Sequence, residues 1–313
     1  MKAFRALAVA GTLVACSIAM LGSWTRINSA GMTCPDWPLC RGAVVPVLHG
    51  GVVLEFTHRL LAGFETFLVA ALIAVGWRLR ARIPGLGGLL IALGIVFVTQ
   101  VLLGGATIFL ANSPISVMIH WGTAMLLVGI LSALVVIAFA YDSQQQPAFG
   151  LGLPRAGLLF FVTACGWVTM CVGAFVSSSG AGLACPGLPG CGSSFFGQTG
   201  PQMVQMLHRV LAATFAISAL AALVLHPRRF SRSTVALRVA VVLLALQITL
   251  GVLNVVLLLP TALREAHAAN AVFTFLGFVI ATVLASLDAS QEPALTNASR
   301  RPLSARAFEG SSG

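Results

Sequence analysis

Two cysteines and two histidines recur at nearly the same spacing in each half of the chain. In chain order, the recurring residues are Cys34, Cys40, His58 and His120, then Cys185, Cys191, His208 and His267. Both residue types bind transition metals, and imidazole is also an axial ligand of haem iron. Unrelated polar residues do not keep such an order twice. The sequence therefore predicts a duplicated unit with two related sites, each able to hold a metal ion or a haem.

The two halves differ at one position beside the first histidine. Glu55 precedes His58 by three residues, whereas Gln205 holds the same place before His208. Residues three apart share a helix face, so each of these side chains should lie over the same pocket as its histidine. A carboxylate can accept or release a proton, and an amide of nearly the same shape cannot. This difference predicts that the first site performs chemistry, with Glu55 as its catalytic residue, and that the second site only holds its ligand.

An arginine directly follows the first histidine of each half. Arg59 and Arg209 could pair with a carboxylate such as a haem propionate, since a guanidinium offers several donors in a fixed geometry. Snorkelling of the same side chains toward lipid headgroups explains their position nearly as well, so both interpretations stay open.

Other polar side chains interrupt the apolar segments. Glu65 lies about two helical turns beyond His58. It could belong to a proton path or pair with a polar neighbour inside the protein, and the pairing is slightly favoured. Gln100 and Gln247 precede the second histidine of their halves at the same distance. We expect both to form hydrogen bonds between helices.

The elements that position these residues are membrane helices. Charged residues make up 8% and hydrophobic residues 58% of the 313 residues, and the mean hydropathy is +0.98, which a soluble domain of this length could not sustain. Crossing about 30 Å of hydrocarbon takes about 20 helical residues. Segments of this kind occur at 6–24, 53–76, 87–110, 117–140, 156–177, 204–225, 235–259 and 266–287. The predicted fold class is an all-α integral membrane protein with eight transmembrane helices.

The net charge of +10 indicates orientation in the membrane. If the chain crosses the membrane eight times, most lysines and arginines fall on the side that carries both termini. The other side has mainly Arg26, Arg41 and Arg264. The positive-inside rule then places both termini in the cytoplasm of a multi-pass protein of the cell membrane. The basic side should attract anionic lipid headgroups, and nucleic acid is not expected as a partner.

The eight helices divide into two tandem repeats. The expected parts are an N-terminal four-helix repeat at 1–141, a cytoplasmic linker at 142–154, a C-terminal four-helix repeat at 155–287 and a disordered cytoplasmic tail at 288–313. With four helices each, the repeats enter the membrane in the same direction, so a pseudo-two-fold axis along the membrane normal should relate them.

The start of the chain has a second interpretation. Residues 13–16, Leu-Val-Ala-Cys, resemble a lipoprotein signal that would be cleaved. Gly22, however, recurs as Gly173 at the same offset from the first cysteine of its half. The first helix is therefore expected to be part of the repeat and to be retained.

All four recurring histidines lie near the start of an even-numbered segment, and those segments begin on the outer side. They should share one depth close to the outer face, where two histidines from separate helices of a bundle can clamp a haem. The alternative is that each is a polar residue satisfied at the interface, which four matched positions disfavour. His49 and His226 have no counterparts and receive no role.

Both cysteine pairs fall in outer loops, where disulfides persist. Four cysteines allow three connectivities, and the duplication favours the local pairs Cys34–Cys40 and Cys185–Cys191. A structural role suffices for the second pair. A redox role stays open for the first, whose loop leads into the Glu55 segment. Zinc is disfavoured because no further histidine or cysteine recurs within the loops.

Taken together, these motifs resemble those of the haem A synthases. The matching residues are Thr25-Arg26, the run Cys-Pro-Asp-Trp-Pro-Leu-Cys at 34–40, Glu55-Phe56-Thr57-His58-Arg59, His208-Arg209 and His267. The resemblance covers residues 6–287 and implies that the C8 methyl group of haem O is oxidised by successive hydroxylations to the formyl group of haem A. The second loop departs from the first, with Gly187 and Leu188 where Asp36 and Trp37 stand.

The resemblance also implies roles for the matched residues. His208 and His267 would ligate the iron of a permanent haem b. His58 and His120 would receive haem O, and Glu55 would be catalytic. The loop cysteines would form disulfides. The implied partners are haem O, a haem O synthase and an electron donor that the sequence does not identify.

Two other classes of protein would use similar residues. A dihaem b-type electron-transfer protein that oxidises quinone needs four histidines but has no use for a unique Glu55. A haem transporter would rock its two repeats about a central site. Product analysis separates the three classes, because only the synthase converts haem O to a formyl haem.

Overall fold

The computed structural model describes residues 1–141, 154–192, 194–226 and 231–299. Eight of its helices are long and apolar enough to cross a membrane, as the sequence predicts. They are α1 (Lys2–Ile27), α2 (Gly51–Trp77), α3 (Leu86–Phe109), α4 (Pro114–Ala140), α5 (Pro154–Ser178), α6 (Gly200–Leu225), α7 (Arg232–Val256) and α8 (Thr261–Ser299), with a short 3₁₀ helix η1 (Ala181–Leu183) before α6.

Local sequence signals set the helix starts. Pro114 and Pro201 occupy the first turns of α4 and α6, where a missing amide proton costs nothing. The Ser113 hydroxyl accepts a hydrogen bond from the Ser116 amide at the start of α4, which satisfies a donor without a helical partner. Between such caps the apolar runs must be helical, because hydrocarbon offers no partners for a free backbone.

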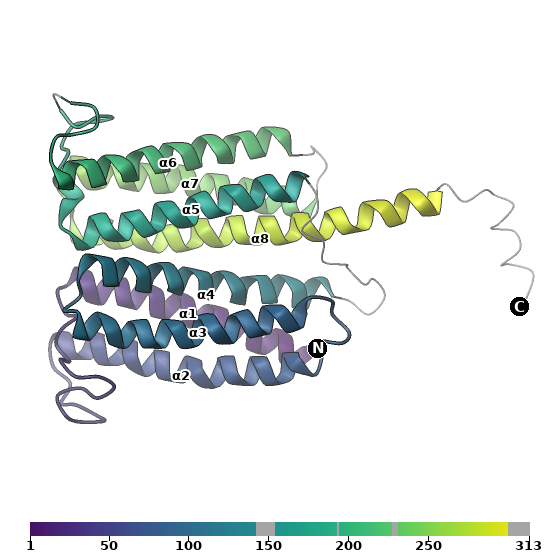
Figure 1. Ribbon diagram of the computed structural model, residues 1–313, viewed down its shortest axis with the longest axis horizontal. Helices are drawn as coiled ribbons and strands as arrows, with labels where there is room; N and C mark the ends of the chain where they lie inside the picture. Colours follow the sequence, from purple (N-terminus) through teal and green to yellow (C-terminus); the bar gives the residue numbers. More distant parts are fainter. Residues whose placement is uncertain (142–153, 193, 227–230, 300–313) are drawn as a thin grey trace, which may run out of the picture.

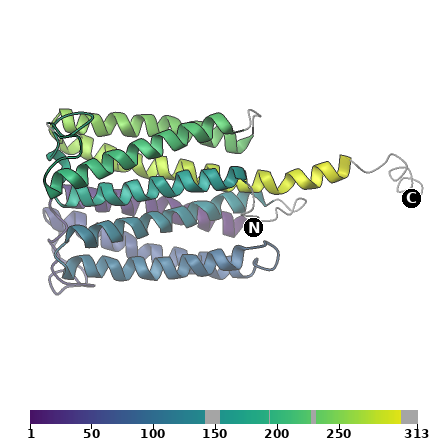
Figure 2. The ribbon, with the colours of Figure 1, turned by 45° about the horizontal axis from the view of Figure 1, so that its top comes forward.

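The helices form two four-helix groups that lie side by side. Helices α1 to α4 make up one group and α5 to α8 the other, in both views of the molecule (Figures 1 and 2). The groups meet where α1 and α4 pack against α5 and α8. The order of helices is therefore the tandem order expected from the sequence, and the pseudo-two-fold axis stays a prediction.

The loops that carry the cysteines lie at one end of the molecule. They connect α1 to α2 and α5 to α6, and the start of α1 and the far end of α8 lie at the opposite end (Figure 1). The starts of α2, α4, α6 and α8, which bear the four histidines, are all at the cysteine-loop end.

The structure differs from the expected domain boundaries near the C-terminus. Helix α8 continues to Ser299, past residue 288, where the disordered tail was expected to begin. Extending an existing helix adds one hydrogen bond for each residue fixed, except at Pro293, which has no amide proton. Residues 142–153 of the expected linker and residues 300–313 of the tail lie outside the described part of the chain.

The turns that lead into α4 and α8 have the same unusual backbone. Ala111 and Asn112 before α4, and Leu258 and Leu259 before α8, have φ between 48° and 61°. This left-handed conformation costs about 1–2 kcal/mol for a residue with a β-carbon, so the packing around both turns must offset it. The matched turns direct the second histidine helix of each half in the same way.

Candidate functional site

The four histidines form two pairs, one in each half. His58 on α2 lies near His120 on α4, and His208 on α6 lies near His267 on α8. The rings of each pair come from separate helices of one bundle, at the cysteine-loop end. The structure thus brings together the histidines that the sequence pairs.

Each histidine ring is accommodated by a glycine on the preceding helix. A β-carbon on Gly22 or Gly173 would lie 2.8 Å from Cε1 of His58 or His208. One on Gly104 or Gly251 would lie 3.3 Å or 3.2 Å from Cε1 of the second histidine of its half. Real β-carbons do not approach to 2.8 Å, so the space for the first ring of each pair depends on the missing side chain.

We expect Gly173→Ala to displace the His208 ring. Alanine normally favours a helix over glycine by about 1 kcal/mol, so helix propensity alone predicts a more stable protein. The β-carbon would instead meet the ring, and the b-type haem absorption per molecule of purified protein should fall. Gly157→Ala in the same helix is the matched control, because among the described residues a β-carbon there would meet no side chain or other helix within 4 Å. Equal haem content in the two variants would contradict the role assigned to Gly173.

Backbone carbonyls fix the first ring of each pair. His58 Nδ1 lies 3.1 Å from the carbonyl oxygen of Ile18, and His208 Nδ1 lies 3.2 Å from that of Thr169. A carbonyl oxygen only accepts, so Nδ1 carries the proton in both neutral rings. Nε2 then presents an unshared electron pair, the arrangement that a carbonyl partner imposes on metal-binding histidines.

Glutamines hold the second ring of each pair. Gln100 Nε2 lies 3.4 Å from His120 Nε2, and Gln247 Nε2 lies 3.2 Å from His267 Nε2. Asn270 Nδ2 donates to Gln247 Oε1 at 2.8 Å and fixes the orientation of that amide. The expected hydrogen bonds between helices are confirmed, with the histidines as partners that the sequence analysis did not name.

The second ring of each pair also has an unsatisfied nitrogen. Nδ1 of His120 and Nδ1 of His267 are buried and have no hydrogen-bond partner among the described residues. An unpaired buried nitrogen costs free energy, and metal-binding sites are places where such groups persist before they are filled. Because the glutamine Nε2 donates to Nε2 of His120 and His267, the unpaired Nδ1 carries the proton, and Nε2 is the atom that could bind iron once it exchanges the glutamine amide for the metal. With that exchange, the two imidazoles of each pair are a donor set that fits the axial ligation of a haem iron.

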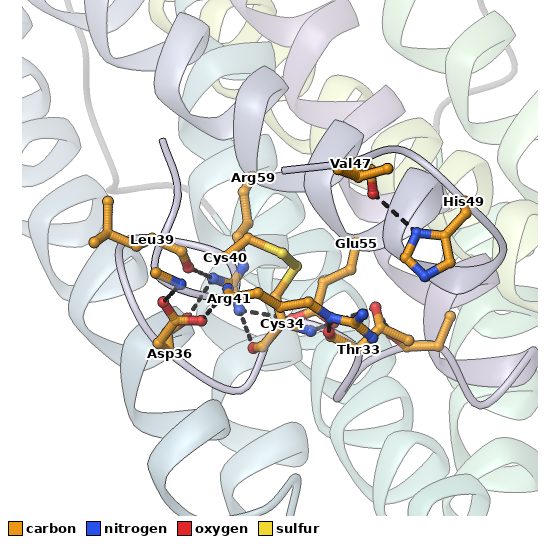
Figure 3. The surroundings of a disulfide bond; sticks show 12 residues. Thr33, Cys34, Asp36, Leu39, Cys40, Arg41, Val47, His49, Glu55 and Arg59 are labelled. Carbon is orange, nitrogen blue, oxygen red and sulfur yellow. Dashed lines mark hydrogen bonds and ion pairs between the residues drawn. A yellow bond between two sulfur atoms is a disulfide. The ribbon is translucent and has the colours of Figure 1, made fainter. Parts of the chain in front are cut away.

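Glu55 joins α2 to the first cysteine loop. Its Oε2 accepts hydrogen bonds from Thr33 Oγ1 and from the Cys34 amide, each at 2.9 Å. Its Oε1 forms an ion pair with Arg59 Nη2 at 2.6 Å. Glu55 is 3% exposed, and Figure 3 shows its side chain among Arg59, Cys34 and Thr33. Glu55 is also near enough to His58 for their charges to interact.

The counterpart Gln205 uses its amide in a related way. Its Oε1 accepts from the Cys185 amide at 2.5 Å, and its Nε2 donates to the Gly182 carbonyl at 2.7 Å. Each side chain therefore matches its partners, since an arginine donates to Glu55 and a carbonyl accepts from Gln205. The difference between the halves has structural consequences as well as the chemical one expected from the sequence.

Arg59 and Arg209 bind the backbone carbonyl oxygens of the cysteine loops. Arg59 donates to the carbonyl oxygens of Cys34, Asp36 and Leu39 at 2.5–2.8 Å. Arg209 donates in the same way to four carbonyl oxygens of the second loop, those of Cys185, Gly187, Pro189 and Gly190. The loops thus take up donors that the expected propionate contacts of these two arginines would use.

Asp36 stabilises a turn of the first loop. Its carboxylate accepts hydrogen bonds from the amides of Gly42 and Arg41 at 2.7 Å and 2.5 Å. These bonds, that from Gly42 foremost, hold the pKa of the Asp36 carboxyl below its usual value. Gly187 at the matching place of the second loop cannot make them.

Trp37 is a site residue to which the sequence analysis gave no position. A β-carbon on Gly105 of α3 would lie 3.1 Å from Trp37 Cδ2, so the indole covers that glycine. Gly105 follows Gly104, which faces His120. Trp37 therefore covers α3 at the residue next to the one that faces His120, and the second loop has Leu188 at the matching position.

One interpretation of the acidic residues is wrong. Glu65 was expected to pair with a polar neighbour, but neither of its carboxylate oxygens has a hydrogen-bond partner in the described part of the chain. Glu65 is 1% exposed, and its Oε1 lies beside Gly11 of α1. The described residues that pack around Glu65 supply no hydrogen-bond donor to its carboxylate.

Both cysteine pairs form local disulfides, Cys34–Cys40 and Cys185–Cys191. Cys16, Cys165 and Cys171 are free. We expect peptide mapping of protein isolated without reductant to recover the same two links. Closing such short loops should stabilise the fold by at most about 3 kcal/mol. Free loop thiols, or a link between the halves, would contradict the assignment.

Comparison with known proteins identifies the family of the chain. Residues 47–279 match the family model described as cytochrome oxidase assembly protein. The haem A synthase of Bacillus licheniformis is 26% identical over 274 residues, which cover 85% of this chain and 91% of that protein. The haem A synthase of Shouchella clausii is 28% identical, over 75% of this chain and 79% of that protein. That of Halalkalibacterium halodurans is 26% identical, over 88% and 96%. The chain belongs to the haem A synthase family of cytochrome oxidase assembly proteins.

Proposed function

We propose that this chain oxidises the C8 methyl group of haem O to the formyl group of haem A by successive hydroxylations within the membrane. The observation that carries the proposal is the pair of matched histidine sites of which only one has a carboxylate beside it. Two equal haem-holding sites would suffice for electron transfer. An acid in one half and an amide in the other indicates that the halves have different tasks.

The second half would hold the resident cofactor. His208 and His267 are the proposed ligands of a haem b, with the His208 ring fixed by the Thr169 carbonyl and the His267 ring by Gln247. When bound, this haem would supply one-electron chemistry. The chain's own contribution is to fix the ring orientations and to keep water out of the bundle.

The first half would hold the substrate. His58 and His120 are the proposed ligands of haem O, and Trp37 covers Gly105, the residue after the glycine that faces His120. Glu55 is the proposed catalytic residue, acting by holding or moving a proton at its carboxylate. Its ion pair with Arg59 fixes the position of that carboxylate under the loop.

The proposed orientation follows the charges. Lysines and arginines gather at the end that carries the start of α1, so this end would be cytoplasmic. The histidine pairs and disulfides would then lie near the outer face, where oxidising conditions preserve the disulfides. A haem O synthase and an electron donor are the proposed partners.

Haem extraction tests the proposed function. The full chain is co-expressed with a source of haem O, and the extracted haems are separated and identified. We expect haem A to accumulate only when the chain and the source of haem O are present together. Retention of haem O without any formyl product, in protein that holds its haem b, would favour a dihaem electron-transfer protein. Movement of unchanged haem across the membrane would favour a transporter.

A further inference from the structure

Three charged side chains lie between the halves at the cysteine-loop end and are not used above. The charges of Arg26 on α1 interact with those of Arg264 and Glu265 on α8. Ser23 Oγ donates to Glu265 Oε2 at 3.1 Å, which joins α1 to α8. Arg26 Nη2 donates to Ser177 Oγ of α5 at 2.7 Å. Thr25-Arg26 is also one of the motifs that carry the family resemblance, and so far it has no role.

Arg26 and Arg264 have guanidinium N–H donors that the described residues do not use. The ion pair found between described residues joins Glu55 and Arg59, and neither Arg26 nor Arg264 has a carboxylate of the described residues within ion-pair distance. Arg26 uses one of its five donors, and no side-chain hydrogen bond of Arg264 occurs among the described residues. Both side chains are partly buried. Two neighbouring guanidinium groups in this state are a site for carboxylate groups, which they bind in a fixed geometry.

The cluster lies one helical turn outward of both histidine pairs. Arg26 follows Gly22, the residue against the His58 ring, by one turn toward the cysteine-loop end. Arg264 precedes His267 by one turn in the same direction. Ser177, the partner of Arg26, follows Gly173 of the second pocket by one turn. The cluster is therefore next to both pockets and on the same side of each.

We propose that Arg26 and Arg264 form a carboxylate-binding site between the halves that takes haem propionates, Arg26 from the haem of the first half and Arg264 from that of the second. The inference rests on the proposed function, since it requires haem in the pockets. The propionates are the only anionic groups of a haem and project from one edge of the ring. Arg59 and Arg209 are less suited to them, because loop carbonyls occupy their donors.

Release of haem b tests the assignment of Arg264. Purified full-length protein is mixed with an excess of an apo-globin, and the transfer of haem b is followed by absorbance. Arg264→Gln should release haem b at least about tenfold faster than the parent chain, since hydrogen bonds to charged groups are the strong ones. Arg264→Lys should be intermediate. Arg41→Gln is the matched control, because it removes the same charge from an exposed loop at the same end of the molecule.

The dimethyl ester of haem b separates a propionate contact from a structural role. In the parent chain, the ester should be released faster than haem b by about the factor seen for Arg264→Gln. The variant should release both at one rate, because the contact is already lost. Arg26→Gln should likewise weaken the binding of haem O, but not of its ester.

The outcomes distinguish the two proposals. Parent protein that holds haem b and releases it no faster after Arg264→Gln would overturn the carboxylate site alone, as would a variant that still discriminates against the ester. Parent protein that holds haem as described but forms no haem A would overturn only the proposed function. Parent protein that binds no haem would overturn both.

Discussion

Purified His208→Ala protein is expected to lack the absorption of a low-spin b-type haem. The iron would lose one of two axial imidazoles, and the remaining pocket offers mainly apolar contacts. Losing even an outer partner of a metal ligand lowers metal affinity by about 10–100-fold, so haem content should fall by at least about tenfold. His267→Ala should have the same effect. The measurement is the pyridine haemochrome content and the reduced-minus-oxidised spectrum of the purified protein.

Two variants control for loss of a histidine as such. His49→Ala removes an exposed imidazole of the first loop, whose Nδ1 contacts only the Val47 carbonyl, and should keep the full spectrum. His58→Ala should keep the haem b spectrum of the second half and lose haem O binding. A full-strength low-spin spectrum in purified His208→Ala would show that the ligands are misassigned.

The helices and the histidine pairs could be predicted from the sequence because each depends on one simple constraint. A long apolar run in hydrocarbon has to be helical, and the duplication pairs His58 with His120 as it pairs His208 with His267. The recurrence of Gly22 as Gly173 was visible too. Its meaning was not, because a glycine against a histidine ring is recognised only once the neighbouring helix and its rotation are known.

The path of the loops could not be predicted. Arg59 follows a site histidine, so a ligand contact was a reasonable expectation from its place in the sequence. In the structure the loop folds back over the start of α2, and the carbonyl oxygens of Cys34, Asp36 and Leu39 converge on this guanidinium. Every residue has a backbone carbonyl, so the sequence does not reveal where several of them converge on one side chain.

Glu65 shows the same limit inside a helix bundle. Its place on α2 was known, but which residues face it depends on how α1 and α2 are rotated. Gly11 faces it, and none of the described residues places a donor within hydrogen-bond distance of the carboxylate. Pairing was expected because most charged residues buried in membranes have partners. That rule says how often such residues are paired and does not say which side chain contacts Glu65.

Glu55→Gln should lower the formation of haem A by at least about 100-fold, the low end for losing a positioned acid or base. The amide keeps the shape of the side chain and loses its proton equilibrium. The haem b spectrum should be preserved, because the residues proposed to hold that haem lie in the other half. Product is measured by haem extraction, and haem O binding by difference spectroscopy on the same preparation.

The ion pair with Arg59 requires a second variant, because Glu55→Gln breaks a largely buried pair as well as removing an acid. The Arg59 guanidinium would keep its loop carbonyls but lose its carboxylate, at some cost in stability. Arg59→Gln breaks the same pair, also removes contacts with the loop, and leaves Glu55 in place. If the carboxylate does chemistry, Arg59→Gln should retain more haem A formation than Glu55→Gln despite disturbing the loop more. Equal losses in the two variants would assign Glu55 to holding the loop. Haem A formation at the parental rate by Glu55→Gln would mean that the difference between Glu55 and Gln205 is structural only, and the first half could no longer be identified as the catalytic half.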